Sequence, residues 1–199
     1  MDCHTRSAYL FKQTFMDHIL SVIAVVIIFG LAVSLLVFQG ITGVPPMSSC
    51  SGEAADVIAL LKQAGLEEQA IIYELGCGWG SLVIALAHAF PQARIRGIEM
   101  SPLPYWVARF RTRHLPNVFL QRGNFYKFDL QDAQAVTCYL MIKTMPTLAG
   151  FLDGMLNPGT PVVAITFWFR GRDVTAERNG PGLRGAAALY YWPANGDAR

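Results

Sequence analysis

The sequence lacks several patterns that would assign it to a common class of protein. Its 199 residues carry a net charge of only +2, which is too small to indicate a nucleic-acid-binding protein. The cysteines form no C-x-x-C pair, so they predict neither a disulfide framework nor a zinc site; they are Cys3, Cys50, Cys77 and Cys138. We therefore expect reduced thiols, no metal and no nucleic acid as a partner.

Charge is also missing from one long stretch. No acidic or basic residue occurs between His18 and Glu53. Residues 19–38 within it are almost entirely apolar, and a helix needs about 20 such residues to cross a bilayer. A cleaved signal peptide would have a shorter apolar run, of roughly 7–15 residues, and a buried core helix would carry more polar positions. We therefore predict one transmembrane helix, with the lipid bilayer as a partner.

This helix divides the chain into five predicted parts. They are a polar arm at 1–18, the transmembrane helix at 19–38, a linker rich in glycine and proline at 39–50, a folded domain at 51–193 and a flexible tail at 194–199. In the domain, strand-like apolar runs alternate with helical patterns. The strand-like runs are at 70–75, 94–100, 117–121, 135–140, 160–169 and 186–192, and the helical patterns are at 51–64, 80–90, 102–114 and 144–156. This alternation predicts an α/β fold with a mostly parallel, doubly wound sheet.

A glycine-rich loop follows the first predicted strand. Gly76, Gly78 and Gly80 lie where such sheets bind ligands, and the missing Cβ atoms allow a ligand to approach the backbone. The spacing is G-x-G-x-G instead of the G-x-G-x-x-G of dinucleotide-binding proteins, and the carboxylate of Glu74 would repel a pyrophosphate. The loop therefore favours a positively charged ligand without phosphate. S-adenosylmethionine, with its α-ammonium and sulfonium groups, fits this description.

Two further residues are predicted to contact the same ligand. Glu99 ends the second predicted strand, where a carboxylate can accept hydrogen bonds from both ribose hydroxyls. Asn124 follows the third strand, and its side-chain amide can pair with adenine. A simple Gly-Asn turn is an equally good interpretation of Asn124.

Three motifs together carry a family resemblance. With E-L-G-C-G-W-G at 74–80, G-I-E-M-S-P at 97–102 and G-N-F at 123–125, the chain resembles the class I S-adenosylmethionine-dependent methyltransferases over about residues 50–168. The resemblance implies their Rossmann-like fold and cofactor, and its motifs add Cys77, Met100 and Phe125 to the cofactor-binding residues. Trp79, Ser81 and Asn124 differ from the family pattern. With its apolar segment and V-P-P linker, the chain is similar to membrane-anchored protein-lysine methyltransferases that modify the ATP synthase c subunit and the adenine nucleotide carrier, and to their bacterial relatives.

The catalytic residues are harder to predict. Methyl transfer from a sulfonium depends mainly on alignment, which can supply about 7–11 kcal/mol, so we expect no catalytic triad. The fourth predicted strand is not followed by N-P-P-Y or D-P-P-Y, which argues against nucleic-acid substrates. Tyr139 is a candidate catalytic residue that could orient an amine, with a packing role as the alternative. The basic cluster Arg109, Arg111, Arg113 and His114 indicates a solvated helix end, with contact to anionic headgroups as the alternative.

We therefore predict a membrane-anchored S-adenosylmethionine-dependent N-methyltransferase that methylates a lysine of a membrane protein, because a tether of about 12 residues keeps its site near the bilayer. The alternatives are methylation of a lipid-soluble small molecule, such as a quinone or lipid, and a membrane-anchored protein that binds the cofactor without turnover. Arg6 and Lys12 precede the apolar run, which favours export of the domain. Cofactor supply and free thiols favour the cytoplasmic side or the organellar matrix, which we expect.

Overall fold

The computed structural model describes residues 16–30, 32–33, 51–179 and 185–193. The chain forms two units, residues 1–43 and 44–199, and each is considered by itself. The predicted linker at 39–50 and tail at 194–199 lie outside the described residues, as do residues 1–15 of the predicted arm.

The prediction of a transmembrane helix at 19–38 is wrong. In the first unit the described helical residues are 16–30 and 32–33. Among the residues that the structure describes, no helix is both long enough and apolar enough to cross a bilayer. An uncharged run predicts a spanning segment only if it forms one continuous helix of about 20 residues, and the continuous helical stretch that the structure describes, residues 16–30, is shorter than that.

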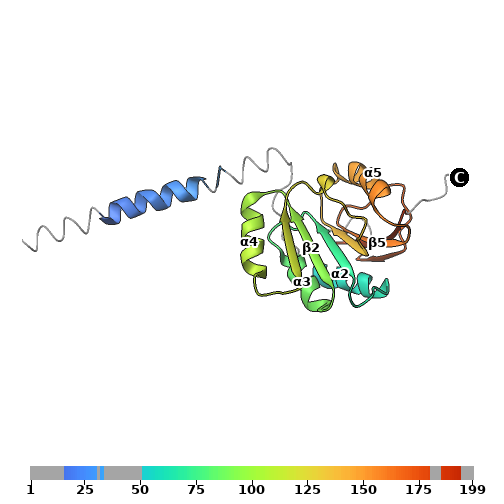
Figure 1. The fold of residues 1–199 in the computed structure, drawn as a ribbon. Coiled ribbons are helices and arrows are strands. Elements are labelled where there is room, and N and C mark those ends of the chain that lie inside the picture. The colour runs from blue at the N-terminus through green and yellow to red at the C-terminus, as the bar shows by residue number, and fades with distance from the viewer. Residues whose placement is uncertain (1–15, 31, 34–50, 180–184, 194–199) are drawn as a thin grey trace, which may run out of the picture. The chain divides into compact units, whose positions relative to one another are not determined.

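The second unit is built on one seven-stranded sheet (Figure 1). In spatial order the strands are β3 (Val118–Arg122), β2 (Arg94–Glu99), β1 (Ile71–Leu75), β4 (Ala135–Cys138), β5 (Thr160–Ile165), β7 (Ala187–Trp192) and β6 (Ala176–Arg178). The first five are parallel, whereas β7 runs antiparallel to both β5 and β6. This confirms the predicted mostly parallel, Rossmann-like sheet. The strand order reverses between β1 and β4, so their carboxyl ends form the crevice where such sheets bind ligands.

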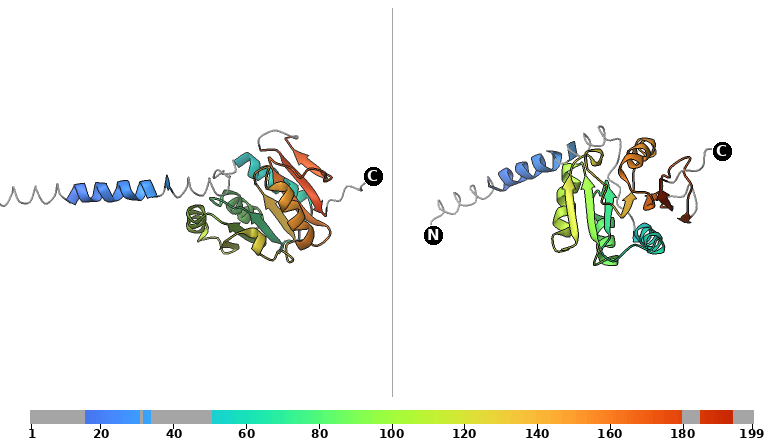
Figure 2. Two further views of the ribbon diagram at one scale, coloured as in Figure 1. Left: turned by 90° about the horizontal axis from the view of Figure 1, so that it is seen from above. Right: turned by 45° about the vertical axis from the view of Figure 1, so that its right-hand side comes forward.

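Helices cover both faces of the sheet, as predicted. They are α2 (Ser51–Gln63), α3 (Ser81–Ala89), α4 (Pro102–Thr112) and α5 (Met145–Met155), and a short 3-10 helix, η1 (Phe125–Lys127), follows β3. On one face, Leu60 of α2 and Leu86 of α3 pack with Ile72 of β1. On the other face, Leu148 of α5 packs with Leu75 of β1. Figure 2 shows the helices and the sheet from two further directions.

Local sequence explains where these elements begin and end. Gly80, with a φ of 79°, turns the chain from β1 into α3, and α3 ends before Pro91. Pro102 lies in the first turn of α4, where its missing N–H needs no partner. Every residue of β4 and β5 is buried, which explains their continuous apolar runs.

The structure differs from the predicted elements in two places. The strand predicted at 160–169 ends at Ile165, because Thr166 has a φ of 64° and leaves the extended conformation. The short strand β6 was not predicted, since two of its three residues, Glu177 and Arg178, are charged. Between β3 and β4 the chain forms only η1, whereas α3, α4 and α5 connect the other parallel strands.

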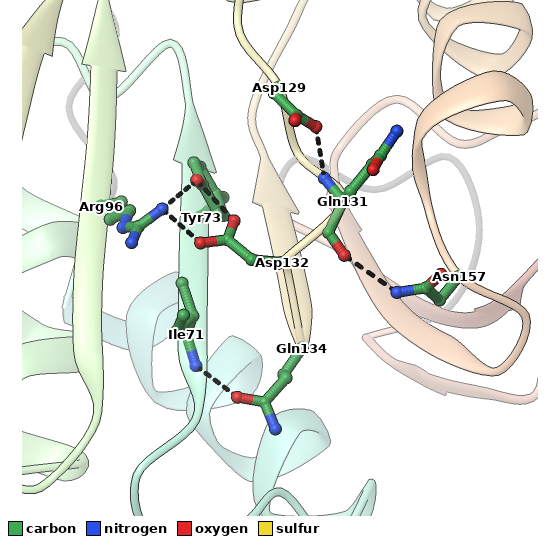
Figure 3. A network of polar contacts seen from close by, with 8 residues as sticks. All are labelled: Ile71, Tyr73, Arg96, Asp129, Gln131, Asp132, Gln134 and Asn157. Carbon is green, nitrogen blue, oxygen red and sulfur yellow. Dashed lines mark hydrogen bonds and ion pairs between the residues drawn. The ribbon is translucent and has the colours of Figure 1, made fainter.

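A polar network ties β1, β2 and the start of β4 together (Figure 3). The guanidinium of Arg96 in β2 donates to the Tyr73 hydroxyl and forms an ion pair with Asp132 at 2.7 Å. The Tyr73 hydroxyl in turn donates to Asp132 at 2.9 Å. The side-chain oxygen of Gln134 accepts from the Ile71 N–H at 3.0 Å. These bonds hold the strands that carry the candidate site in a defined register.

Candidate active site

The glycine loop between β1 and α3 has a backbone that requires glycine. Gly76, Gly78 and Gly80 all have positive φ, at 76°, 50° and 79°. The N–H groups of Gly76 and Cys77 donate to the Ile98 carbonyl at 2.9 and 3.1 Å. A Cβ on Gly76 would lie 2.8 Å from the Leu140 side chain, and one on Gly80 would lie 2.9 Å from Ala108. The turn and its packing require these glycines by themselves, and the predicted contact of the loop with the cofactor stays a prediction.

Glu99 is buried at the end of β2 and is tied to this loop. One carboxylate oxygen accepts from the Gly78 N–H at 2.8 Å, and the other accepts from the Ser101 N–H at 2.7 Å. Each carboxylate oxygen has two lone pairs, so these bonds leave acceptor capacity for ribose hydroxyls. Glu99 therefore shapes the loop in the protein itself, and its ribose role stays a prediction.

Glu74 lies at the end of β1 with only 4% of its surface exposed. Its Oε2 has no hydrogen-bond partner among the described residues. Burial raises the pKa of Glu74 well above its usual value, and the charge of Glu99 raises it further, while a hydrogen bond from the Val83 backbone acts in the opposite direction. An unpaired buried carboxyl oxygen requires an explanation, and a cationic ligand group such as the α-ammonium would provide one.

The neighbouring residues Cys77 and Met100 have different surroundings. The Cys77 thiol is buried, and burial, followed by the charges of Glu74 and Glu99, raises its pKa well above the usual value. Such a thiol is a poor nucleophile, so Cys77 can contribute only packing or backbone contacts. Met100 follows β2 and is 41% exposed. Their predicted cofactor contacts stay predictions.

The loop after β3 adopts the turn that was one of the two interpretations of Asn124. The Asn124 side-chain oxygen accepts from the Tyr126 N–H at 3.1 Å and caps η1. The rings of Phe125 and Tyr126 are 4.4 Å apart between centroids and tilted by 50°. The predicted contacts of Asn124 and Phe125 with adenine stay predictions.

Tyr139 is the first residue after β4, next to the point where the strand order reverses. Its hydroxyl is buried and has no hydrogen-bond partner among the described residues. A buried polar atom without a partner costs about 1–3 kcal/mol. The hydroxyl is therefore a good candidate to bond a group that a bound molecule supplies. Metal ligands are not gathered in this region or elsewhere in the described part of the chain, where no group of three or more His, Cys, Asp or Glu side chains could hold a metal ion.

Sequence reasoning missed one contact of the loop. Arg111 of α4 donates to the Trp79 carbonyl at 2.6 Å and to the Ser81 hydroxyl at 3.2 Å. Trp79 and Ser81 are the two loop residues that depart from the family pattern, and here they share one arginine. The position of Arg111 near a helix C-terminus predicted a solvated helix end, with contact to anionic headgroups as the alternative. This contact was missed because its partners lie in a different part of the chain.

Comparison with known proteins gives this site a family. Residues 74–176 match the ANTKMT methyltransferase domain family. The chain belongs to this family. The matched range includes the glycine loop, Glu99, the loop after β3 and Tyr139. A protein-lysine N-methyltransferase of Saccharolobus islandicus is 30% identical over 115 residues, which make up 56% of this chain and 71% of the relative.

Other relatives agree on the class of protein. A trans-aconitate 2-methyltransferase of Deinococcus radiodurans is 31% identical over 113 residues, covering 55% of this chain and 41% of the relative. Among solved structures, an RNA methyltransferase from Salinibacter ruber in complex with S-adenosyl-L-homocysteine is similar, with a TM-score of 0.64 and 26% identity, covering 77% of this chain and 97% of the other. This member of the ANTKMT family is a class I methyltransferase that uses S-adenosylmethionine, as the sequence motifs predicted.

Proposed function

We propose that the protein transfers a methyl group from S-adenosylmethionine to the side-chain amine of a lysine in another protein. The observation that carries the proposal is the protein-lysine N-methyltransferase of Saccharolobus islandicus, which this chain matches over 71% of its length. The site supports it with groups suited to a cationic cofactor and an amine. Glu74 offers a buried carboxyl oxygen and Tyr139 a buried hydroxyl, neither of which has a partner among the described residues.

The reaction needs few groups from the protein. The lone pair of a neutral lysine amine attacks the methyl carbon, the carbon–sulfur bond breaks, and S-adenosylhomocysteine leaves as the neutral thioether. The methylated amine then loses a proton to water. The protein's contribution is to align amine and methyl. The position of Tyr139 after the carboxyl end of β4 supports a part in this alignment, because its hydroxyl can accept a hydrogen bond from the amine.

A second candidate substrate is RNA. The observation that favours it is the Salinibacter ruber RNA methyltransferase, nearly all of which aligns with this chain. Its identity to this chain is 26%, below the 30% of the lysine methyltransferase. We therefore place RNA second.

The decisive experiment offers the purified protein all candidate acceptors at once. The protein is incubated with S-adenosylmethionine carrying a labelled methyl group and a lysate of a strain that lacks the gene. Protein, RNA and lipid fractions are then analysed by mass spectrometry. Label on lysine residues supports the proposal, whereas label confined to RNA or to lipids and quinones contradicts it. Cofactor binding without any transfer would indicate a binding protein without turnover.

The Tyr139→Phe variant tests the proposed site in the same assay. It keeps the ring and removes a hydroxyl that has no partner among the described residues. Losing one hydrogen bond to the amine should lower kcat about tenfold, from about 1–1.5 kcal/mol, with cofactor affinity unchanged. The melting temperature should not fall, because no described hydrogen bond is lost. Unchanged kcat would assign Tyr139 to packing alone.

The predicted membrane-protein substrate depended on the apolar segment as a tether, so the proposed acceptor is a protein lysine without that restriction. For location we propose the compartment in which S-adenosylmethionine is available, the cytoplasmic side or its organellar equivalent. The buried free thiols Cys77 and Cys138 are consistent with a reducing compartment. A reporter joined after Arg199 that is active only outside that compartment would contradict this.

A further inference from the structure

The region around α4 and β3 carries charge of one sign. From Met100 to Phe128 the sequence contains no aspartate or glutamate. Its basic residues are Arg109, Arg111, Arg113, Arg122 and Lys127, with His114 beside them. Since the whole chain has a net charge of only +2, this excess is local. A local excess of positive charge attracts an anionic partner.

A groove of about 760 Å³ lies within this region. Residues of β2, β3 and α4 line it, among them Arg94, Arg109, Arg113, Phe119 and Leu120. The three arginines are exposed, and Phe119 is 50% exposed. The groove is therefore both concave and basic, with apolar side chains between the charges.

One side of the groove is the free edge of the sheet. Within the described residues β3 pairs with β2 alone. The Ile95 N–H donates to the Asn117 carbonyl, and the Gly123 N–H donates to the Glu99 carbonyl. Alternate residues of a strand direct their backbone groups to the same side. Since Asn117 and Gly123 bond to β2, the odd-numbered residues of β3 direct their backbone groups toward β2. The even-numbered residues of β3 therefore direct their N–H and C=O groups away from β2, where another strand could pair with them.

The arginines lie on both sides of this edge. The Arg94 side chain lies on the same face of the sheet as that of Ile98, because both are even-numbered residues of β2, and Ile98 packs in the core that contains α5. Arg109 and Arg113 lie in and directly after α4, which is on the opposite face because its Ala108 packs against Gly80 at the start of α3. A strand added beside β3 would project alternate side chains to the two faces. Acidic side chains on either face would meet an arginine.

Two of these arginines are also held in place. The Arg109 guanidinium donates to the Tyr105 hydroxyl at 3.1 Å. The Arg113 guanidinium lies 4.0 Å from the centroid of the Phe110 ring and donates to the Phe110 carbonyl at 2.8 Å. Groups that are positioned before binding lose less conformational freedom when the partner arrives.

We propose that the edge of β3 binds an extended acidic segment of the protein substrate, which joins the sheet as an additional strand. This inference rests on the proposed function, to which it adds a docking segment separate from the methylated lysine. The open row of backbone N–H and C=O groups selects a polypeptide, because only another backbone matches them in register. RNA or an anionic lipid surface would pair the arginines and leave that row without partners.

The test measures binding of labelled peptides by fluorescence anisotropy. The first peptide is extended in character, with glutamate alternating with threonine and valine. The second has the same sequence with glutamine in place of glutamate, and the third is the acidic peptide with alternate backbone amides methylated. An oligonucleotide of matching charge and vesicles of anionic lipid are offered in parallel. We expect the acidic peptide to bind at least tenfold more tightly than each of the other four probes.

Matched variants locate the site. Arg109→Gln combined with Arg113→Gln should weaken binding of the acidic peptide at least tenfold. Arg170→Gln combined with Arg178→Gln removes the same charge from exposed residues, one of them in β6 at the other edge of the sheet, and should change binding less than twofold. Equal losses in the two variants, or no binding by the parent protein, would overturn the proposal.

The remaining outcomes also decide. If the amide-methylated peptide binds as well as the intact one, no strand is added and the proposal is wrong. Tighter binding of the oligonucleotide or the vesicles would reassign the surface to RNA or to a membrane. A protein that methylates lysine in a short peptide yet fails these binding tests retains the proposed function without the docking site, so the two failures are distinguishable.

Discussion

Replacing Glu74 by glutamine should stabilise the empty protein and weaken its binding of S-adenosylmethionine. The parent buries this carboxyl group with one oxygen unpaired among the described residues, next to the charge of Glu99. An unsatisfied buried polar group costs about 1–3 kcal/mol, and more when charged. Glutamine has nearly the same shape but cannot ionise, so at neutral pH we expect it to recover about 1–2 kcal/mol. For a chain of this size that raises Tm by about 2–8 °C.

The gain should depend on pH. Burial raises the pKa of Glu74, so below the usual carboxyl range the group is protonated in both folded and unfolded protein, and the parent loses nothing. As pH rises toward the raised folded pKa, the unfolded chain ionises first, and the stability of the parent falls. The glutamine variant lacks this fall. The difference in Tm between the two proteins should therefore grow over a pH series that begins near about pH 5.

Binding should respond in the opposite direction. The cofactor's α-ammonium would give the Glu74 carboxylate the partner it lacks, and charge-assisted hydrogen bonds are about twice as strong as neutral ones. Calorimetry should show that Glu74→Gln weakens S-adenosylmethionine by about 1 kcal/mol more than it weakens an analogue without the α-ammonium, a factor of about five. In the same experiment, nicotinamide cofactors should remain without measurable affinity.

Glu99→Gln is the matched control. The two oxygens of the Glu99 carboxylate accept from the backbone N–H groups of Gly78 and Ser101. In glutamine one of these oxygens is replaced by an NH2 group, which is a donor and cannot accept from the backbone N–H. One hydrogen bond is therefore lost, and Tm should fall. A fall in Tm for Glu74→Gln at high pH, or parental affinity for S-adenosylmethionine in that variant, would refute the reasoning about Glu74.

Further substitutions at Glu99, Asn124 and Arg111 test the remaining parts of the site by calorimetry. Glu99→Ala should weaken S-adenosylmethionine by about 1.5–3 kcal/mol, and unchanged affinity would remove Glu99 from the ribose site. Asn124→Asp keeps the cap on η1 and should bind the cofactor at least as well as the parent, whereas Asn124→Leu should bind about fivefold more weakly; parental affinity in both would show that the loop does not touch adenine. Arg111→Gln should weaken cofactor binding by about 1 kcal/mol, because it removes the hydrogen bonds to Trp79 and Ser81. Arg113→Gln, at the end of the same helix, should leave cofactor binding unchanged. Equal effects of the two variants would contradict a specific role of Arg111 in holding the glycine loop.

Sequence reasoning succeeded where local pattern and topology determine the structure. The alternation of apolar strands and helices predicted the doubly wound sheet, and the order of strands then brought the ends of β1 and β2 together. Glu74 and Glu99 were placed in one region for that reason, and the structure has them close enough for the charge of one to raise the pKa of the other. The glycines at 76, 78 and 80 were recognisable because only positive φ and tight packing demand them at that spacing.

The failures have physical causes as well. The contact of Arg111 with the loop depends on how α4 packs, which no local pattern encodes. Thr166 ends β5 by adopting a positive φ that is uncommon for a β-branched residue, so its sequence still looked like a strand. In the first unit, the transmembrane prediction at 19–38 rested on the uncharged, apolar composition of the run. Spanning a bilayer depends in addition on the length of the continuous helix.

The pairing of β5 with β7 has a consequence for synthesis of the protein. β5 lies inside the sheet between β4 and β7, yet β7 comes last among the described strands. Until residues 187–192 have left the ribosome, the buried strand β5 has one edge without a partner, and such edges readily pair with other chains. The sheet therefore completes its pairing only after β7 has been synthesised. A nascent chain stalled before Ala187 should be a client for chaperones, and C-terminal truncations should aggregate.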